Sequence, residues 1–172
     1  MELMQALMER RSVRKFTDQP VSREILEKLA DAALHAPSGR GSKTWKFTVV
    51  SNAEAIEKLC AAVGKALGRE NYDMYKPVAL IIPSNDPEND LAHDDNACAL
   101  QNIFLAAYGF GVGSVWINQL RDCCDEPGVR AVLTELGIPE NYEITGIAAL
   151  GYADPDAPKG VYKEKGEVNF VE

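Results

Sequence analysis

The sequence has no run of about 18 apolar residues, so it predicts no membrane-spanning helix and no membrane partner. It also has no excess of positive charge, because 26 acidic residues outnumber 18 basic ones and the formal net charge is -8. Proteins that bind nucleic acid need an extended basic face. Nucleic acid is therefore not expected as the main partner.

Residues that could ligate a metal are few and irregularly spaced. The four cysteines and two histidines are Cys60, Cys98, Cys123, Cys124, His35 and His93. Structural zinc sites use regularly spaced pairs of such residues, and the chain has no C-x-x-C pair, so no metal site is expected. Cys60 and Cys98 lie on apolar helical patterns typical of the core. A redox role for the adjacent Cys123 and Cys124 stays open, although neighbouring cysteines form strained disulfides.

Length and composition are typical of one globular domain spanning residues 1–172. The hydrophobic fraction is 46% and the mean hydropathy is -0.20, so the chain can bury a core. The opening stretch, M-E-L-M-Q-A-L-M-E-R-R, carries an acidic residue at position 2, and its basic residues follow the apolar part. This order is the reverse of a secretory signal, so we expect a cytoplasmic protein.

Hydrophobic periodicity predicts helices that alternate with strands. Helical spacing predicts helices over 2–10, between Ser22 and Pro37, from a cap at Ser51 or Asn52 to residue 67, over 97–108, and from Pro127 to Gly137. Apolar or alternating runs predict strands over 45–50, 78–83, 115–118 and 144–150. This order predicts an α+β or α/β protein with a small mixed sheet wrapped by helices. The acidic run 86–95 is interpreted as a solvated loop.

The stretch 8–17, M-E-R-R-S-V-R-K-F-T, concentrates positive charge in an acidic protein. It contains four of the 18 basic residues within six positions, namely Arg10, Arg11, Arg14 and Lys15. Guanidinium groups match phosphate geometry bidentately, and the hydroxyl of Ser12 adds an uncharged donor. In an extended chain Arg10, Ser12 and Arg14 lie on one side. The pattern predicts an anion site, and the alternative is a solvated helix end whose cations complement the helix dipole.

The segment 151–172 is a tail with little apolar surface of its own. Its short apolar patch is Val168-Asn-Phe170-Val171. Such a tail cannot stabilise itself, so we expect it to pack on a sheet edge or on a partner subunit.

Four segments of the sequence, which follow one another over nearly the whole chain, form a pattern when they are taken together. The segments are R-R-S-V-R-K-F, A-P-S-G-R-G-S-K-T-W, A-L-Q-N-I-F-L-A-A-Y-G-F-G-V-G-S-V-W-I-N, and A-A-L-G-Y followed by the tail. In this order they resemble the FMN-dependent nitroreductase family. The resemblance implies an α+β fold and an intertwined homodimer that binds one FMN per site at the subunit interface. It also implies that the tail, about 152–172, packs on the partner subunit.

The resemblance further implies which residues hold the flavin. Those around the FMN phosphate and the pyrimidine edge of the ring would be Arg10, Arg11, Ser12 and Arg14, with Lys163 of the tail returning to the phosphate. The loop of the other subunit would contribute Pro37, Ser38, Gly39 and Lys43. Backbone groups around Trp116, Ile117 and Asn118 would face flavin N5 and O4. The family loop usually has Asn in place of Gly41 and Gln in place of Lys43, which affects ring contact and substrate preference.

The activity that the resemblance implies is reduction of small electron acceptors. NAD(P)H would reduce the FMN and leave, and a nitroaromatic, a quinone or a related acceptor would enter the same pocket, in a ping-pong mechanism. Flavin carries the hydride chemistry itself, so no catalytic side chain is expected. Two alternatives stay open. One is a flavin-binding sensor or storage protein without turnover, and the other is an oligomeric binding module whose basic cluster meets a different phosphate ligand.

Overall fold

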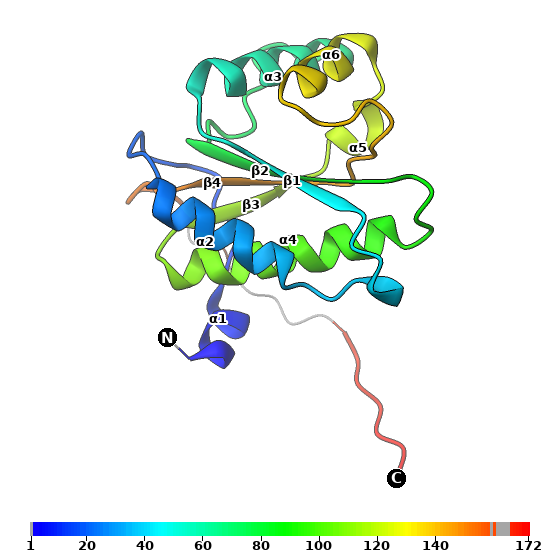
Figure 1. Cartoon of the computed structure of the whole chain (residues 1–172). Helices are drawn as coiled ribbons and strands as arrows, with labels where there is room; N and C mark the ends of the chain where they lie inside the picture. Colours follow the sequence, from blue (N-terminus) through cyan, green and yellow to red (C-terminus); the bar gives the residue numbers. More distant parts are fainter. Residues whose placement is uncertain (1, 159, 161–165) are drawn as a thin grey trace.

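A four-stranded sheet lies between two layers of helices (Figure 1). The computed structural model describes residues 2–158, 160 and 166–172. In chain order the elements are α1 (Leu3–Glu9), α2 (Arg23–Leu34), the 3-10 turn η1 (Gly39–Gly41), β1 (Trp45–Val50), α3 (Ala53–Ala66), β2 (Ala79–Asn85), α4 (Ala92–Gly109), β3 (Gly113–Ile117), α5 (Leu120–Cys123), α6 (Pro127–Glu135) and β4 (Ile147–Gly151). Helices α3, α5 and α6 cover one face of the sheet, and α2 and α4 cover the other. The predicted α+β class is confirmed.

The sheet has the strand order β1-β2-β4-β3, and every neighbouring pair is antiparallel. The prediction of a mixed sheet is therefore wrong. A helix between two strands favours a parallel crossover. Here, however, the end of β1 pairs with the start of β2, with Val50 opposite Leu80. After α3 the segment 67–78 returns the chain to the same end of the sheet at which β1 finished. This segment has no periodic apolar pattern, so the sequence does not predict its path.

The helix ends follow local chemistry that the sequence already displays. The Ser22 hydroxyl accepts a hydrogen bond from the Ile25 amide at 3.3 Å, and the Asn52 side chain accepts one from the Ala55 amide at 2.9 Å. These side chains cap α2 and α3. Pro127 begins α6, and Gly137 follows it at φ +83°, a conformation that favours glycine. The predicted starts and stops of these helices are confirmed.

Helix α4 begins at Ala92, several residues before the predicted start. Its first turn takes up part of the acidic run 86–95, and Asp95 is only 3% exposed. The interpretation of that run as a solvated loop is therefore wrong for Asp95. A buried carboxylate needs donors to replace water, and two of those donors come from the loop 37–44.

The core consists of two clusters, one on each face of the sheet. One cluster joins α3, α5 and α6 to the sheet, and the other joins α2 and α4 to it. Burial raises the pKa of Cys60 to about 11 and also raises the pKa of Cys123 and of Cys124. All three thiols are buried and free of disulfides. Burial and a raised pKa both lower the reactivity of a thiol, which disfavours a redox role for the Cys123-Cys124 pair.

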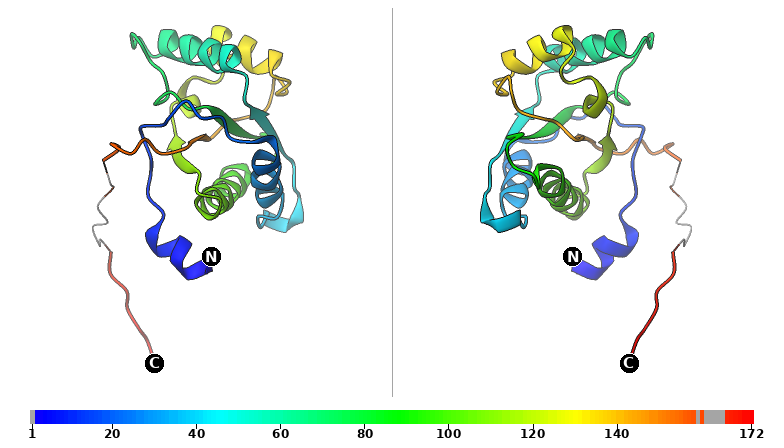
Figure 2. Two further views of the ribbon diagram at one scale, coloured as in Figure 1. Left: turned by 90° about the vertical axis from the view of Figure 1, so that its left-hand side faces the viewer. Right: turned by 90° about the vertical axis from the view of Figure 1, so that its right-hand side faces the viewer.

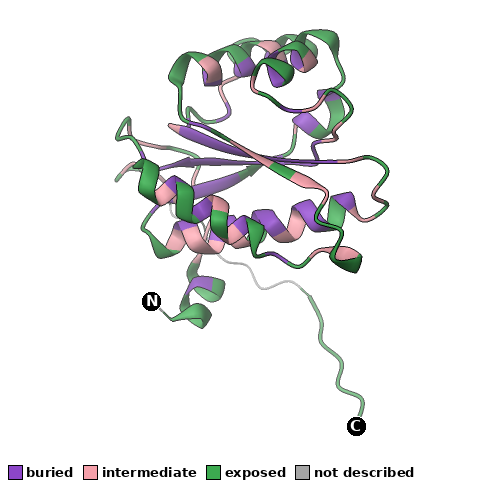
Figure 3. Cartoon of the chain, in the orientation of Figure 1, coloured by how far each residue is buried: buried purple, intermediate pink, exposed green. Residues whose placement is uncertain are grey.

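Among the described residues, no helix is long and apolar enough to cross a membrane. The most exposed large apolar side chains belong to α1 and to residues 166–172. Both project away from the layers on the same side of the molecule (Figure 2) and are mostly exposed (Figure 3).

The cap of α3 gives a stability prediction with a matched control. Asn52→Ala should lower the free energy of unfolding by about 1 kcal/mol, because the amide of Ala55 loses its side-chain acceptor. Ser51→Ala changes the preceding polar residue, which does not cap the helix, and should stay within about 0.5 kcal/mol of the unmodified protein. Urea denaturation of the three proteins measures the difference. Equal losses in both variants would contradict the assignment of the cap.

Candidate functional site

The basic stretch leaves α1 and runs extended along the edge of the sheet. Arg10 is the C-terminal cap of α1, with φ -54° and ψ 132°. Ser12 forms a parallel bridge to Ser114 of β3, and the Val13 amide donates to the Ser114 carbonyl at 3.0 Å. Farther on, the Thr17 amide donates to the Tyr152 carbonyl at 2.8 Å. The stretch is extended, which is the condition under which Arg10, Ser12 and Arg14 lie on one side, and it is held against β3 and the end of β4.

The side chain of Arg10 is half-buried over an aromatic ring. Its guanidinium carbon lies 5.8 Å from the centroid of the Phe104 ring in α4. The Phe104 ring in turn lies 6.2 Å from the Trp116 ring of β3, at an interplanar angle of 50°. Burial, followed by the charge of Arg11, lowers the pKa of Arg10, but a guanidinium stays protonated at neutral pH. Two sequence segments of the predicted site, around Arg10 and around Trp116, are therefore brought together by Phe104.

The four cations of the basic stretch have different partners. Lys15 pairs with Asp154 at 3.2 Å. Arg11 donates to the carbonyls of Met8 and Arg10 at 2.7 and 2.8 Å, so it closes the end of α1 as the alternative interpretation of a helix end requires. Arg14 lies 6.0 Å from the Tyr75 ring. Within the described part of the chain, neither Arg10 nor Arg14 forms an ion pair, so their two charges are uncompensated by carboxylates.

The end of β3 offers backbone groups at a sheet edge. Because β3 is the last strand in the order β1-β2-β4-β3, one of its sides has no strand. The basic stretch bridges to that side at Ser114, and within the described ranges no further bridge covers Trp116–Asn118. Ile117 points into the core, Trp116 is 38% exposed, and Asn118 is exposed. One backbone group at this end of β3 already has a partner, because the Asn118 carbonyl accepts a hydrogen bond from the Arg121 amide at 3.0 Å.

The loop 37–44 lies at the other end of α4. The Gly39 amide and the Ser38 hydroxyl donate to the two oxygens of Asp95, at 2.7 and 2.9 Å. Pro37 and Lys43 are exposed, whereas Ser38 and Gly39 are half-buried. Sequence reasoning missed Asp95. A signal was present, because Asp95 lies on the four-residue spacing of Ala99, Ile103 and Ala107, which are all fully buried.

The predicted residues fall into two separate groups within one chain. One group is the loop 37–44, which is bonded to Asp95, and the other is the basic stretch, whose Arg10 packs on Phe104. Asp95 and Phe104 are nine residues apart in α4, so the two contact points are separated by about 13 Å along the helix axis. Figure 1 shows η1 below the first turns of α4 and α1 below its later turns. Lys163 lies outside the described residues. Gly160 of the tail is near the basic stretch, since a Cβ built on it would be 3.3 Å from Cβ of Arg11.

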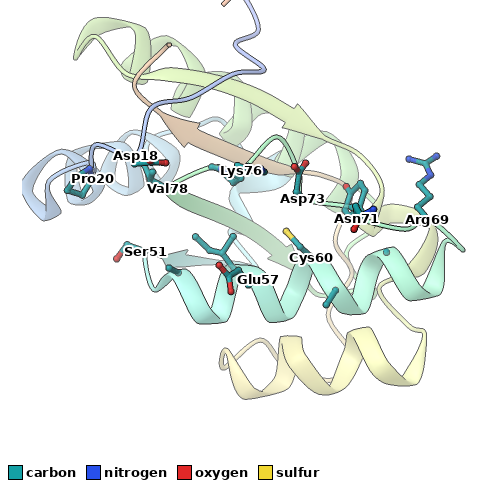
Figure 4. A pocket seen from close by; sticks show the side chains of 16 residues that line it. Asp18, Pro20, Ser51, Glu57, Cys60, Arg69, Asn71, Asp73, Lys76 and Val78 are labelled. Carbon is teal, nitrogen blue, oxygen red and sulfur yellow. The ribbon is translucent and has the colours of Figure 1, made fainter.

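A cavity of about 760 Å³ lies between α3 and the segment 69–78 (Figure 4). Its lining includes Glu57, Cys60, Asp73 and Lys76, and none of the predicted site residues. The described residues also contain no cluster of His, Cys, Asp and Glu that could hold a metal ion. The basic stretch with the edge of β3 is therefore the better candidate for an anionic ligand.

The comparisons with known proteins cover the same segments. The family model described as "Nitroreductase family" matches residues 7–79 and 69–152. A protein of Archaeoglobus fulgidus with "NADH dehydrogenase/NAD(P)H nitroreductase" in its name is 32% identical over 175 residues, covering 98% of this chain and 94% of that protein.

Two crystal structures of nitroreductases with bound FMN resemble the whole chain. The one from Bacteroides fragilis is 36% identical, covers 100% of both chains and has a TM-score of 0.93. The one from Desulfitobacterium hafniense is 27% identical, covers 100% of both chains and has a TM-score of 0.83. With the edge-bound basic stretch, the loop and the sheet all inside the matched residues, the chain belongs to the nitroreductase family.

Proposed function

We propose that this protein is an FMN-dependent oxidoreductase that uses NAD(P)H to reduce nitroaromatics, quinones or related acceptors by a ping-pong mechanism. The observation that carries the proposal is the pair of uncompensated cations, Arg10 and Arg14, beside the uncovered edge of β3. Relatives that match the whole chain are named as nitroreductases, two of them with bound FMN. We further propose that the protein works in the cytoplasm.

The chemistry of these residues fits FMN. A phosphate monoester carries close to two negative charges at neutral pH, and guanidinium groups bind it through paired, charge-assisted hydrogen bonds. Arg10 and Arg14 supply the charge, and Ser12 between them supplies a hydroxyl donor on the same extended segment. The half-exposed Trp116 and the backbone of Ile117 and Asn118 supply a flat surface and polar groups for a ring. In this proposal Arg11 lies beside the phosphate site while it is bonded to the carbonyls at the end of α1. Lys163 of the tail adds a positive charge next to the phosphate.

The protein's part in the reaction is binding and orientation. Bound FMN supplies the hydride chemistry. Arg10 and Arg14 neutralise the phosphate and keep the cofactor in place between turnovers, which a ping-pong mechanism requires. The backbone at Trp116–Asn118 presents hydrogen-bonding groups to the ring edge, and the loop residues Pro37, Ser38, Gly39 and Lys43 close the site from the other subunit. Lys43 brings a positive charge toward a ring that becomes more negative on reduction.

We also propose that the active form is a homodimer. In a single chain the apolar residues of α1 are uncovered, since Leu3, Met4 and Met8 are 64–66% exposed and only Ala6 is buried. A helix of seven residues is not stable in water without packing. Val168, Phe170 and Val171 in the tail are 80–90% exposed. A second copy that covers α1 and receives the tail, residues 152–172, buries both surfaces and brings a loop 37–44 to each basic stretch.

The first test of the function is the spectrum of the purified protein. We expect a yellow protein that releases FMN on denaturation, identified by chromatography, because the site has a phosphate cluster and no adenine-binding fingerprint. Anaerobic NAD(P)H should bleach the flavin, and a nitroaromatic or quinone should restore the colour. A colourless protein that takes up no added FMN would contradict the proposal. A flavin that NAD(P)H leaves oxidised would instead indicate a sensor or storage protein.

Arginine variants test the phosphate site. Arg10→Ala and Arg14→Ala should each weaken FMN binding by roughly 1.5–3 kcal/mol, the contribution of a charge-assisted hydrogen bond. Lys15→Ala is the matched control, because it removes a neighbouring charge that is already paired with Asp154. Titration of the apoprotein with FMN, followed by quenching of flavin fluorescence, measures the three affinities. The site is misassigned if all three variants bind alike.

A truncation tests the dimer and the role of the tail. Removing residues 155–172 should weaken both self-association and FMN binding, because the tail is expected to pack on the second subunit. Sedimentation of the full-length and truncated proteins at micromolar concentration, with and without FMN, measures both effects. A full-length protein that sediments as a monomer with flavin bound would refute the dimeric site.

A further inference from the structure

Two aspartates fasten the loop 37–44. The exposed Asp90 accepts from both Nη atoms of Arg40 at 2.9 and 3.0 Å, and the buried Asp95 accepts from the residues that begin the loop. Asp95 accepts hydrogen bonds from the Gly39 amide at 2.7 Å, from the Ser38 hydroxyl at 2.9 Å and from Nδ2 of Asn89 at 3.1 Å. It is only 3% exposed, and within the described residues no cation pairs with it. Its charge is therefore balanced by neutral donors, two of which come from the loop. Such bonds to an ionised acceptor are stronger than those between neutral groups.

The loop holds part of its conformation by its own hydrogen bonds, since the Gly41 amide donates to the Ser38 carbonyl at 3.0 Å and the Lys43 amide donates to the Ser38 hydroxyl at 3.0 Å. Its backbone is nevertheless in an unfavourable conformation. Arg40, Gly41 and Lys43 have φ values of +56°, +68° and +48°. This left-handed region is unfavourable for residues that have a side chain, so contacts within the loop and contacts with its surroundings both have to maintain it. Gly39 also lies very close to the start of α4, since a Cβ built on it would be 2.2 Å from Cδ1 of Leu91.

A second layer of hydrogen bonds extends from Asp95 to the far end of the loop. Asn89 donates through Nδ2 to the Thr44 hydroxyl at 3.0 Å, and Thr44 donates to Oδ1 of Asn85 at 2.7 Å. Asn85 is the last residue of β2 and is fully buried. Both ends of the loop are thus tied to one polar cluster between β2 and α4, in which the Asp95 carboxylate carries the charge.

We propose that Asp95 is a positioning residue for cofactor binding. It holds residues 38–43 in the conformation in which the loop meets the FMN, and it does not touch the cofactor itself. The inference rests on the proposed function. In the proposed homodimer the loop meets the basic stretch of the other subunit, so Asp95 acts on the site that contains the arginines of the second subunit.

The central experiment compares two neighbouring aspartates. Asp95→Asn keeps the size of the side chain but replaces one acceptor oxygen by the NH2 group of an amide. This NH2 group cannot accept the hydrogen bonds that Ser38 and Asn89 donate to Asp95. We expect the dissociation constant for FMN to rise about tenfold or more. Asp94→Asn makes the same change of charge in the same helical turn, at an exposed position, and should bind FMN within about twofold of the unmodified protein. Equal affinities in both variants, or equal losses, would overturn the proposal.

Tryptic cleavage gives a readout that needs no flavin. The loop contains Arg40 and Lys43, and trypsin cuts after such residues only where the chain can open locally. The apoprotein with Asp95→Asn should be cut there faster than the unmodified or Asp94→Asn protein. If the unmodified protein binds no FMN, the proposed function fails, and this cleavage alone still decides whether Asp95 holds the loop. Unchanged cleavage would show that it does not.

Mixed dimers test whether the effect crosses the subunit interface. Co-expression with two affinity tags yields a dimer of one Asp95→Asn chain and one Arg14→Ala chain. If Asp95 acts on the other subunit's site, this dimer has one intact site and should bind one FMN tightly per dimer. If it acts within its own chain, both sites are damaged and no tight binding remains, which would overturn the trans assignment.

A second variant covers the case in which Asp95→Asn does not fold. Asn89→Ala removes the link between Asp95 and Thr44 from a half-buried position. It should change FMN affinity and cleavage in the same direction as Asp95→Asn. Affinity and cleavage like those of the unmodified protein would count against the positioning role.

Discussion

The two central strands of the sheet determine where polar chemistry is allowed. Every residue of β2 and of β4 is buried, because helices cover both faces of the sheet. Charged or ligand-binding groups cannot face such a core without a large loss of hydration. They are therefore restricted to the ends of the strands and to the two edges of the sheet, one at β1 and the other at β3. The basic stretch lies on the edge at β3, and the polar cluster around Asn85 lies where β2 ends.

Several of the positively charged side chains in this protein are neutralised by a neighbouring acidic or carbonyl group. The chain is acidic overall, yet Lys15 and Arg40 each have an aspartate beside them, and Arg11 is bonded to the carbonyls at the end of a helix. Arg10 and Arg14 contact aromatic rings instead, which lowers the exposure of their stems without cancelling their charge. A cluster that looks uniform in the sequence thus separates into cations that stabilise the fold and cations that are available to a ligand.

Sequence reasoning succeeded where the cause of a structure is local. The caps at Ser22 and Asn52, the start of α6 at Pro127 and the strand Trp45–Val50 all follow from a few adjacent residues. It failed where the cause is tertiary. The antiparallel order depends on the return of the segment 67–78, and the short helix α5 has too few residues to show a period. For the site, the arginines and the loop stand out by composition. The contacts of Arg10 with Phe104 and of the loop with Asp95 cannot be recognised in the sequence, because each contact joins residues more than fifty positions apart.

The buried thiols have a consequence for the lifetime of the protein. A flavin oxidoreductase passes electrons to small acceptors, and molecular oxygen is an acceptor that flavins readily use. Oxidation of cysteine to sulfenic acid proceeds from an accessible thiolate. Cys60, Cys123 and Cys124 are inside the cluster beneath α3, α5 and α6, and burial keeps them protonated. The same packing that completes the core therefore shields these sulfur atoms from the oxidants that the protein's own chemistry can generate.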